Sequence, residues 1–154
     1  MPRLTVTKDI AAFPEKVFQA AADFRGAPGR IRGIKRIEVL TEGPVRVGTR
    51  FKETRKMFGK EATETMEVVA FDPPNGYTLA CESHGCRYRT EFRFKGNAGG
   101  TRVEMAFEAT PLTFLAKAMG FLMAPMIKSV SKLVDQDLKD LKASVEGKAA
   151  PAAR

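Results

Sequence analysis

Residues 111–146 decide the fold, and they read PLTFLAKAMGFLMAPMIKSVSKLVDQDLKDLKASVE. Apolar residues recur at every third or fourth position, which is typical of an amphipathic helix with a single apolar stripe. The stripe comprises Met119, Met123, Met126, Ile127, Val130, Leu133, Val134, Leu138, Leu141 and Val145. The pattern predicts one long helix from Pro111 to about Glu146. A lone amphipathic helix needs a sheet to cover its stripe.

The residues that precede this helix alternate with a period of two. From Ile34 to Ala109 apolar and polar side chains alternate, which predicts six consecutive antiparallel strands. Turn-forming residues separate them at 42–48, 58–60, 72–76, 84–85 and 95–100. Another alternating strand spans Leu4 to Ile10, and a short helix opened by Pro14 follows it. A second short helix or turn is expected over residues 27–33.

Two tight turns predict which side chains share a face of the sheet. A two-residue loop at Gly59-Lys60 would place Phe51 opposite Val68, Glu53 opposite Met66, Arg55 opposite Glu64 and Met57 opposite Ala62. A turn at His84-Gly85 would place Cys81 opposite Tyr88, Leu79 opposite Thr90 and Tyr77 opposite Phe92. The strand over residues 61–71 has apolar residues on both faces, so its register stays open, and a bulge before Asp72 would reconcile them.

Several short stretches also match a known family. They are IAAFPEKVF at 10–18 with DF at 23–24, GTRF at 48–51, FDPP at 71–74, GGTRV at 99–103 and DLKDLK at 137–142. Over nearly the whole chain their order resembles the SRPBCC superfamily, which includes START lipid-transfer domains, birch pollen allergen proteins and bacterial polyketide cyclase/dehydrase-like proteins. The resemblance implies an α+β helix-grip fold, in which a curved antiparallel sheet of about seven strands wraps around the C-terminal helix and encloses a ligand cavity.

Composition narrows the classes of function. The 154 residues suffice for one domain, expected over residues 1–146 and followed by a disordered tail over 147–154. Lys and Arg number 26 against 18 Asp and Glu, so the formal net charge is +8, which favours anionic partners. The basic residues lack interleaved aromatic residues for base stacking, which argues against nucleic acid. A transient contact with an anionic membrane surface stays open.

The cysteine and histidine residues do not indicate a metal site. Cys81 and Cys86 lack zinc-ligand spacing, and His84 is the only histidine, interpreted as a surface turn residue. We therefore expect no metal and no cofactor. Free cysteines, and the lack of an apolar signal segment after Met1, predict a cytoplasmic protein. The apolar run 112–127 is interrupted and shorter than the roughly 20 residues of a membrane span. The sequence leaves the oligomeric state undefined.

The leading hypothesis is binding of a lipid-like or polycyclic aromatic molecule in the cavity. The candidate ligand-binding residues are Phe51, Glu53, Arg55, Met66, Val68, Leu79, Tyr88, Phe92, Met105, Phe107, Met119, Met123 and Ile127. By register the charged residues Glu53, Arg55 and Glu64 face the apolar side, where they must be paired, hydrated or functional. They form either a structural Arg55–Glu64 salt bridge or, together with Tyr88, the acid–base groups of a cyclase or dehydratase that needs no cofactor. A third alternative is docking of a protein or membrane on the apolar segment 112–126.

Overall fold

A computed structural model describes residues 3–57, 59–123 and 127–147. Its elements are β1 (Arg3–Ile10), α1 (Pro14–Ala22), the 3-10 helix η1 (Ala27–Gly29), β2 (Ile34–Val39), β3 (Arg50–Met57), β4 (Lys60–Asp72), β5 (Gly76–Ser83), β6 (Cys86–Asn97), β7 (Gly100–Pro111), α2 (Phe114–Met123) and α3 (Ile127–Val145). The strands form one antiparallel sheet in the order β1-β7-β6-β5-β4-β3-β2. The predicted α+β helix-grip fold is confirmed. Residues 148–154 of the predicted tail lie outside the described residues.

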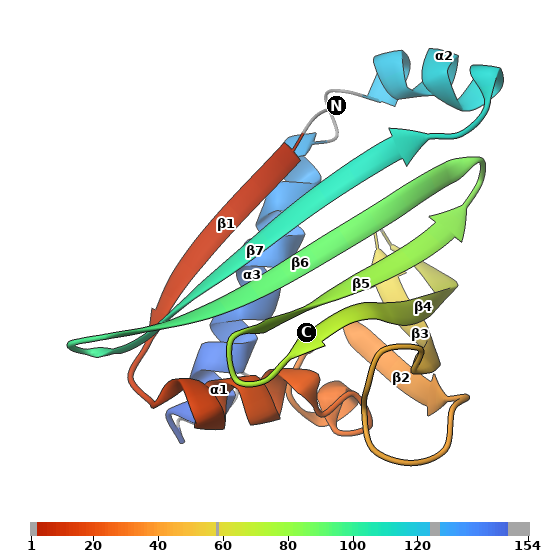
Figure 1. Cartoon of the computed structure of the whole chain (residues 1–154). Coiled ribbons are helices and arrows are strands. Elements are labelled where there is room, and N and C mark those ends of the chain that lie inside the picture. Colours follow the sequence, from red (N-terminus) through yellow and green to blue (C-terminus); the bar gives the residue numbers. More distant parts are fainter. Residues whose placement is uncertain (1–2, 58, 124–126, 148–154) are drawn as a thin grey trace.

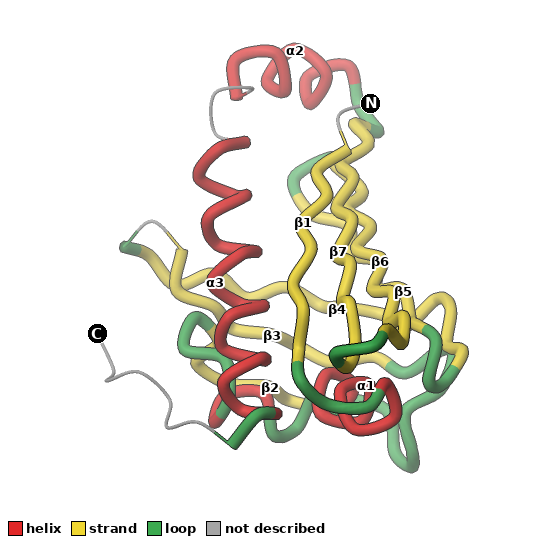
Figure 2. Tube along the Cα trace, turned by 90° about the vertical axis from the view of Figure 1, so that its left-hand side faces the viewer, coloured by secondary structure: helices red, strands yellow, loops and turns green. Residues whose placement is uncertain are grey.

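The sheet curves around α3, which crosses one of its faces (Figure 1). The helix α1 lies across one end of the sheet, and α2 lies at the opposite end, apart from α3 (Figure 2). The strands β1 and β2 occupy opposite edges of the sheet. The chain passes from one edge to the other through α1 and η1, which lie between these two strands in the sequence. This arrangement leaves the middle of the sheet and α3 facing each other.

The long helix expected from Pro111 is wrong in its first part. Pro111 still belongs to β7, and the backbone N–H of Leu112 donates to the carbonyl of Gly85 at 2.7 Å, so the chain stays attached to the sheet beyond Pro111. Helix α2 begins only at Phe114, where the Thr113 hydroxyl accepts a hydrogen bond from the N–H of Ala116 at 3.0 Å. This cap sets the start of the helix. Two helices, α2 and α3, therefore replace the predicted single one.

The segment predicted as a second short helix or turn contains both. Residues 27–29 form a 3-10 helix, and turns follow up to residue 33. The backbone N–H of Arg32 donates to the buried Asp140 carboxylate of α3 at 3.0 Å, so this part of the segment is held by a tertiary contact.

The two predicted hairpins have different outcomes. In the β5–β6 hairpin, Cys81 faces Tyr88, Leu79 faces Thr90 and Tyr77 faces Phe92, as predicted. In the β3–β4 hairpin, the register is two residues away from the prediction, since Phe51 faces Met66, Glu53 faces Glu64, Arg55 faces Ala62 and Met57 faces Lys60. The reason is that Gly59, with a φ of +79°, takes the last loop position, directly before Lys60. The predicted Arg55–Glu64 pair is therefore wrong.

The shift by two residues leaves each side chain on its predicted face, because strand side chains alternate with a period of two. On the outer face the hydroxyls of Thr54 and Thr63 are hydrogen-bonded at 2.8 Å. The expected irregularity in residues 61–71 is present, as the β4–β5 register shifts between Val68 and Ala70.

A solid core fills the end of the molecule where α1 and the C-terminal half of α3 meet the sheet. The side chains that are almost wholly buried there include Ile10, Val17, Val68, Val103 and Leu138. The ring of Phe18 packs on Phe71, Tyr77 and Phe94, with centroids 5.4–5.8 Å apart. This core fixes α3 against the sheet at one end, and the space farther along the helix stays unfilled.

Candidate functional site

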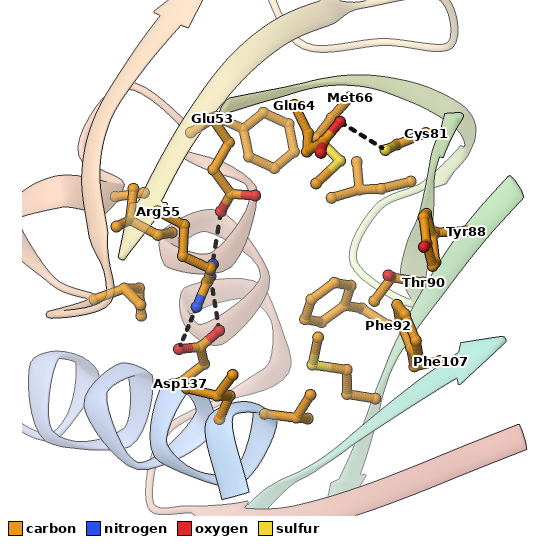
Figure 3. A pocket seen from close by; sticks show the side chains of 18 of the residues that line it. Glu53, Arg55, Glu64, Met66, Cys81, Tyr88, Thr90, Phe92, Phe107 and Asp137 are labelled. Carbon is orange, nitrogen blue, oxygen red and sulfur yellow. Dashed lines mark hydrogen bonds and ion pairs between the residues drawn. The ribbon is translucent and has the colours of Figure 1, made fainter. Parts of the chain in front are cut away.

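A cavity of about 460 Å³ lies between the sheet and α3. Side chains from β2 to β7, α1 and α3 line it, and most of them are apolar (Figure 3). Its volume falls in the range of natural small-molecule sites, roughly 300–1,000 Å³. The sequence-based prediction of a cavity between the sheet and the C-terminal helix thus agrees with the structure.

Nine of the thirteen predicted ligand-binding residues line the cavity: Phe51, Glu53, Arg55, Met66, Leu79, Tyr88, Phe92, Met105 and Phe107. The structure places two others elsewhere. Val68 is wholly buried in the core, because the bulge and the two-residue shift place it beyond the cavity, and Met119 is 49% exposed on α2. The side chains of Met123 and Ile127 lie outside the described residues.

The charged centre of the cavity is Arg55, held by two carboxylates. Its guanidinium contacts Asp137 Oδ1 at 3.1 Å and Oδ2 at 2.8 Å, and Glu53 Oε1 at 3.2 Å (Figure 3). All three side chains are largely buried, with 14–19% of each exposed. The contact to Asp137 is bidentate, which is the strong geometry for an arginine–carboxylate pair. It ties β3 to α3 across the cavity.

The pKa shifts in this cluster reflect two carboxylates that share one cation. Burial alone would lower the pKa of Arg55, but the charges of Asp137 and Glu53 outweigh it and raise that pKa. Burial raises the pKa of the Asp137 carboxyl, Arg55 offsets this only in part, and the negative charge of Glu53 adds to it. Arg55 therefore stays charged, and its single positive charge is shared by two carboxyl groups.

A second polar group lies where β4 meets the β5–β6 turn. The hydroxyl of Ser83 donates to Glu64 Oε1 at 2.9 Å and lies 2.7 Å from His84 Nδ1. The thiol of Cys81 lies 4.0 Å from Glu64 Oε2. Figure 3 shows Glu64 and Cys81 set apart from the Arg55–Asp137 pair. Glu64, Cys81, Ser83 and His84 all line the cavity.

The neighbouring thiol and phenol keep their protons at neutral pH. Burial, with a further contribution from the Glu64 charge, raises the pKa of Cys81 to about 11. Burial and the nearby Cys86 raise the pKa of Tyr88, whose ring stacks on Phe107 with centroids 5.8 Å apart. Tyr88 is therefore a hydrogen-bond donor in the cavity wall, and Cys81 is a neutral apolar residue. Both cysteines are free, as predicted.

The sequence did contain signals for some of the residues that the prediction missed. Asp137 lies three positions after Val134 and four before Leu141, so helical spacing puts this acid within the apolar stripe. Glu64, two residues before Met66, was predicted to face inward but was not included among the ligand-binding residues. His84 was interpreted as a surface residue, and its side chain is exposed but borders the cavity. Nothing in the local sequence places a turn residue beside a cavity.

Within the described residues, no group of three or more His, Cys, Asp or Glu side chains could hold a metal ion. No helix in this part of the chain is long and apolar enough to cross a membrane.

A family model described as polyketide cyclase/dehydrase and lipid transport matches residues 1–146. The chain belongs to this family. That finding confirms the resemblance seen in the sequence. The match to the polyketide cyclase/dehydrase and lipid transport family includes every strand and helix described above. None of the curated proteins compared with the chain matches it.

Solved structures confirm the fold of this family member. TTHA0849 from Thermus thermophilus has a TM-score of 0.77 at 21% identity, over 95% of this chain and 98% of that one. The Zhui aromatase/cyclase of a Streptomyces species has a TM-score of 0.75 at 16% identity, over 94% and 93%. The di-domain aromatase/cyclase StfQ of the steffimycin biosynthetic pathway has a TM-score of 0.75 at 14% identity, over 94% of this chain and 50% of that one.

Proposed function

We propose that this protein binds a hydrophobic small molecule, lipid-like or polycyclic aromatic, in the cavity between the sheet and α3. The observation that carries this proposal is the cavity of about 460 Å³ with its mainly apolar wall. Burial of apolar ligand surface would supply the binding free energy, at about 25 cal/mol per Å² before the costs of association. Two free cysteines suit a reducing compartment, and we propose the cytoplasm as the place of binding.

Protein purified from its own host tests this proposal. Native mass spectrometry should show a bound small molecule, and solvent extraction should release it. A chain that carries nothing and takes up no apolar compound added to it would contradict the proposal.

A second candidate is catalysis of a cyclisation or dehydration. The family description and the aromatase/cyclase neighbours favour it, as do the polar groups Glu53, Arg55 and Tyr88 in the wall. A cavity of this kind could fold a reactive poly-ketone, while a carboxylate accepts a proton and the Tyr88 hydroxyl donates one.

Glu53→Gln and Tyr88→Phe separate binding from catalysis. If the protein only binds, each change should alter the affinity for an apolar ligand by at most about 1–3 kcal/mol, the scale of one buried hydrogen bond. If it is a cyclase or dehydratase, one of them should lower the rate by roughly 10²–10⁴ with little effect on affinity. Product analysis with a panel of aromatic poly-ketones gives the rates. Absence of turnover by the unmodified protein on the whole panel would reject catalysis of these substrates.

Helix α2 favours a further role, docking on an anionic membrane surface from which a ligand would be taken. Four apolar side chains at this end are exposed: Leu112 by 53%, Phe114 by 89%, Leu115 by 73% and Met119 by 49%. The exposed Lys117 lies among them, and the whole chain carries a formal net charge of +8. Exposed apolar residues beside a cation suit insertion into an anionic interface.

The double change Phe114→Glu and Leu115→Glu should reduce association with vesicles of anionic phospholipid by about tenfold or more, because each such side chain that leaves water contributes about 1.5–3 kcal/mol. Vesicle sedimentation measures this. Val47→Glu, at a residue that is 60% exposed in the loop before β3, is the matched control and should change little. Docking is rejected if the unmodified chain stays in the supernatant.

A further inference from the structure

The charged groups of the cavity wall differ in whether they have an ion-pair partner. Two guanidinium groups line it, and both are paired: Arg55 with Asp137 and Glu53, and Arg30 with Asp23 at 3.2 Å. Of the three lining carboxylates, Glu53 and Asp137 share Arg55, but Glu64 has no ion pair with any described residue. The wall therefore contains one carboxylate, Glu64, without a counter-ion in the described part of the chain. Among the described residues that line it, each guanidinium group already has a carboxylate partner.

The hydrogen bonds around Glu64 determine which atoms are left for a ligand. A carboxylate only accepts, so the single hydroxyl proton of Ser83 is given to Glu64. Ser83 Oγ must then accept from His84, whose Nδ1 carries the proton at 2.7 Å. In the tautomer that has this proton on Nδ1, the lone pair of the ring lies on Nε2. Glu64 also has acceptor capacity to spare, because a carboxylate offers about four lone-pair positions and, among the described residues, only the Ser83 hydroxyl and the Cys81 thiol are directed at it.

Glu64 and Nε2 of His84 at this side of the cavity can therefore accept a hydrogen bond from a ligand. We propose that the cavity selects an apolar molecule that carries a hydrogen-bond donor, such as a phenol or alcohol, which it presents to Glu64 and His84, and that it rejects apolar carboxylates. This proposal rests on the proposed function, since it names the class of ligand for the same cavity. A ligand carboxylate would meet three wall carboxylates and two cations that are already paired. A hydroxyl would instead form a hydrogen bond to a charged group, the stronger kind.

Three fluorescent probes with one skeleton test this proposal at neutral pH: pyrene, hydroxypyrene and pyrene carboxylate. Titration with the full chain, followed by each probe's own fluorescence, should show hydroxypyrene binding about ten- to hundredfold more tightly than pyrene carboxylate. Pyrene itself should lie between them. The neutral apolar part is the same in all three, so the differences report the polar group alone.

Glu64→Gln should reduce the preference for hydroxypyrene over pyrene carboxylate by about tenfold, because it removes the uncompensated charge while the side chain keeps its size. Circular dichroism checks that the variant is folded. Glu67→Gln is the matched control on the same strand, because Glu67 faces outward, is 48% exposed and lies 3.8 Å from Arg50; it should leave the preference unchanged. Pyrene carboxylate binding as tightly as hydroxypyrene, or a preference that Glu64→Gln does not alter, would overturn the proposal.

The same experiment separates two kinds of failure. If pyrene binds and the polar group makes no difference, the cavity binds apolar ligands and only the inference about Glu64 and His84 is overturned. If none of the probes binds, the proposed function fails and the inference fails with it.

The single histidine gives an independent measurement. Nitrogen NMR should show His84 protonated at Nδ1 with the lone pair on Nε2, and Ser83→Ala should move that proton to Nε2, the tautomer usual in water. Protonation at Nε2 in the unmodified chain would overturn the role given to His84.

Discussion

Arg55→Met is expected to lower the free energy of unfolding by about 3–5 kcal/mol at neutral pH, because it leaves the carboxylates of Glu53 and Asp137 largely buried without a cation. The methionine roughly preserves the volume of the side chain, so the loss reports charge and not a void. Denaturant unfolding followed by circular dichroism measures it. Arg50→Met is the control on the same strand, since the Arg50–Glu67 pair is exposed and long at 3.8 Å; it should cost at most about 1 kcal/mol.

The loss caused by Arg55→Met should shrink as the pH falls. In that variant Arg55 no longer offsets the effect of burial, so the pKa of the Asp137 carboxyl lies further above its unfolded-state value. A raised folded-state pKa means that the ionised form costs stability at higher pH, and that this cost disappears as the group gains its proton. The difference in unfolding free energy from the unmodified chain should therefore narrow toward about pH 4–5. A loss that does not depend on pH would show that packing is responsible.

Phe107→Arg is expected to weaken the binding of Nile red, a neutral environment-sensitive dye, by about a hundredfold or more. The Phe107 ring lines the cavity and stacks on Tyr88. A guanidinium there occupies part of the cavity and places a charge beside the dye, and an apolar dye cannot compensate for the lost hydration of that charge. Dye fluorescence gives the affinity, and far-UV circular dichroism should show unchanged strand content.

Phe13→Arg is the matched control, because Phe13 is 78% exposed and lies outside the cavity lining. It should leave dye binding unchanged. Equal binding by the Phe107→Arg variant and the unmodified chain would place the dye on a surface patch, for which the exposed side chains of α2 are the obvious position.

The accuracy of the sequence prediction depended on how well each turn was defined. His84 and Gly85 both have a positive φ, +51° and +75°, and form the tight turn that was expected, so the β5–β6 register was predicted correctly. Gly59 could occupy either position of a two-residue loop, and the prediction chose the wrong one. The error was an even number of residues, so Phe51, Glu53 and Arg55 were still assigned to the inward face.

The partners of those residues could not be predicted in the same way. The pairing of Arg55 with Asp137 joins residues that are 82 positions apart in the chain, and its geometry depends on how far α3 lies from β3. The first part of the long predicted helix was wrong for a similar reason. Residues 112–123 continue an apolar pattern, but the contact of Leu112 with Gly85 is a tertiary interaction that periodicity does not encode.

The strand order has a consequence for the order in which the chain assembles. The first strand, β1, pairs only with the last, β7, so that Leu4 faces Phe107. The strands from β2 to β7 are sequence neighbours and can pair as successive hairpins, whereas β1 must wait until the whole remainder of the sheet has been synthesised. Closing so long a loop is slow, because its entropy is lost before its contacts form. On the ribosome, β1 should therefore emerge first and dock last, and a nascent chain stalled before β7 would leave both β1 and the edge of β6 unpaired.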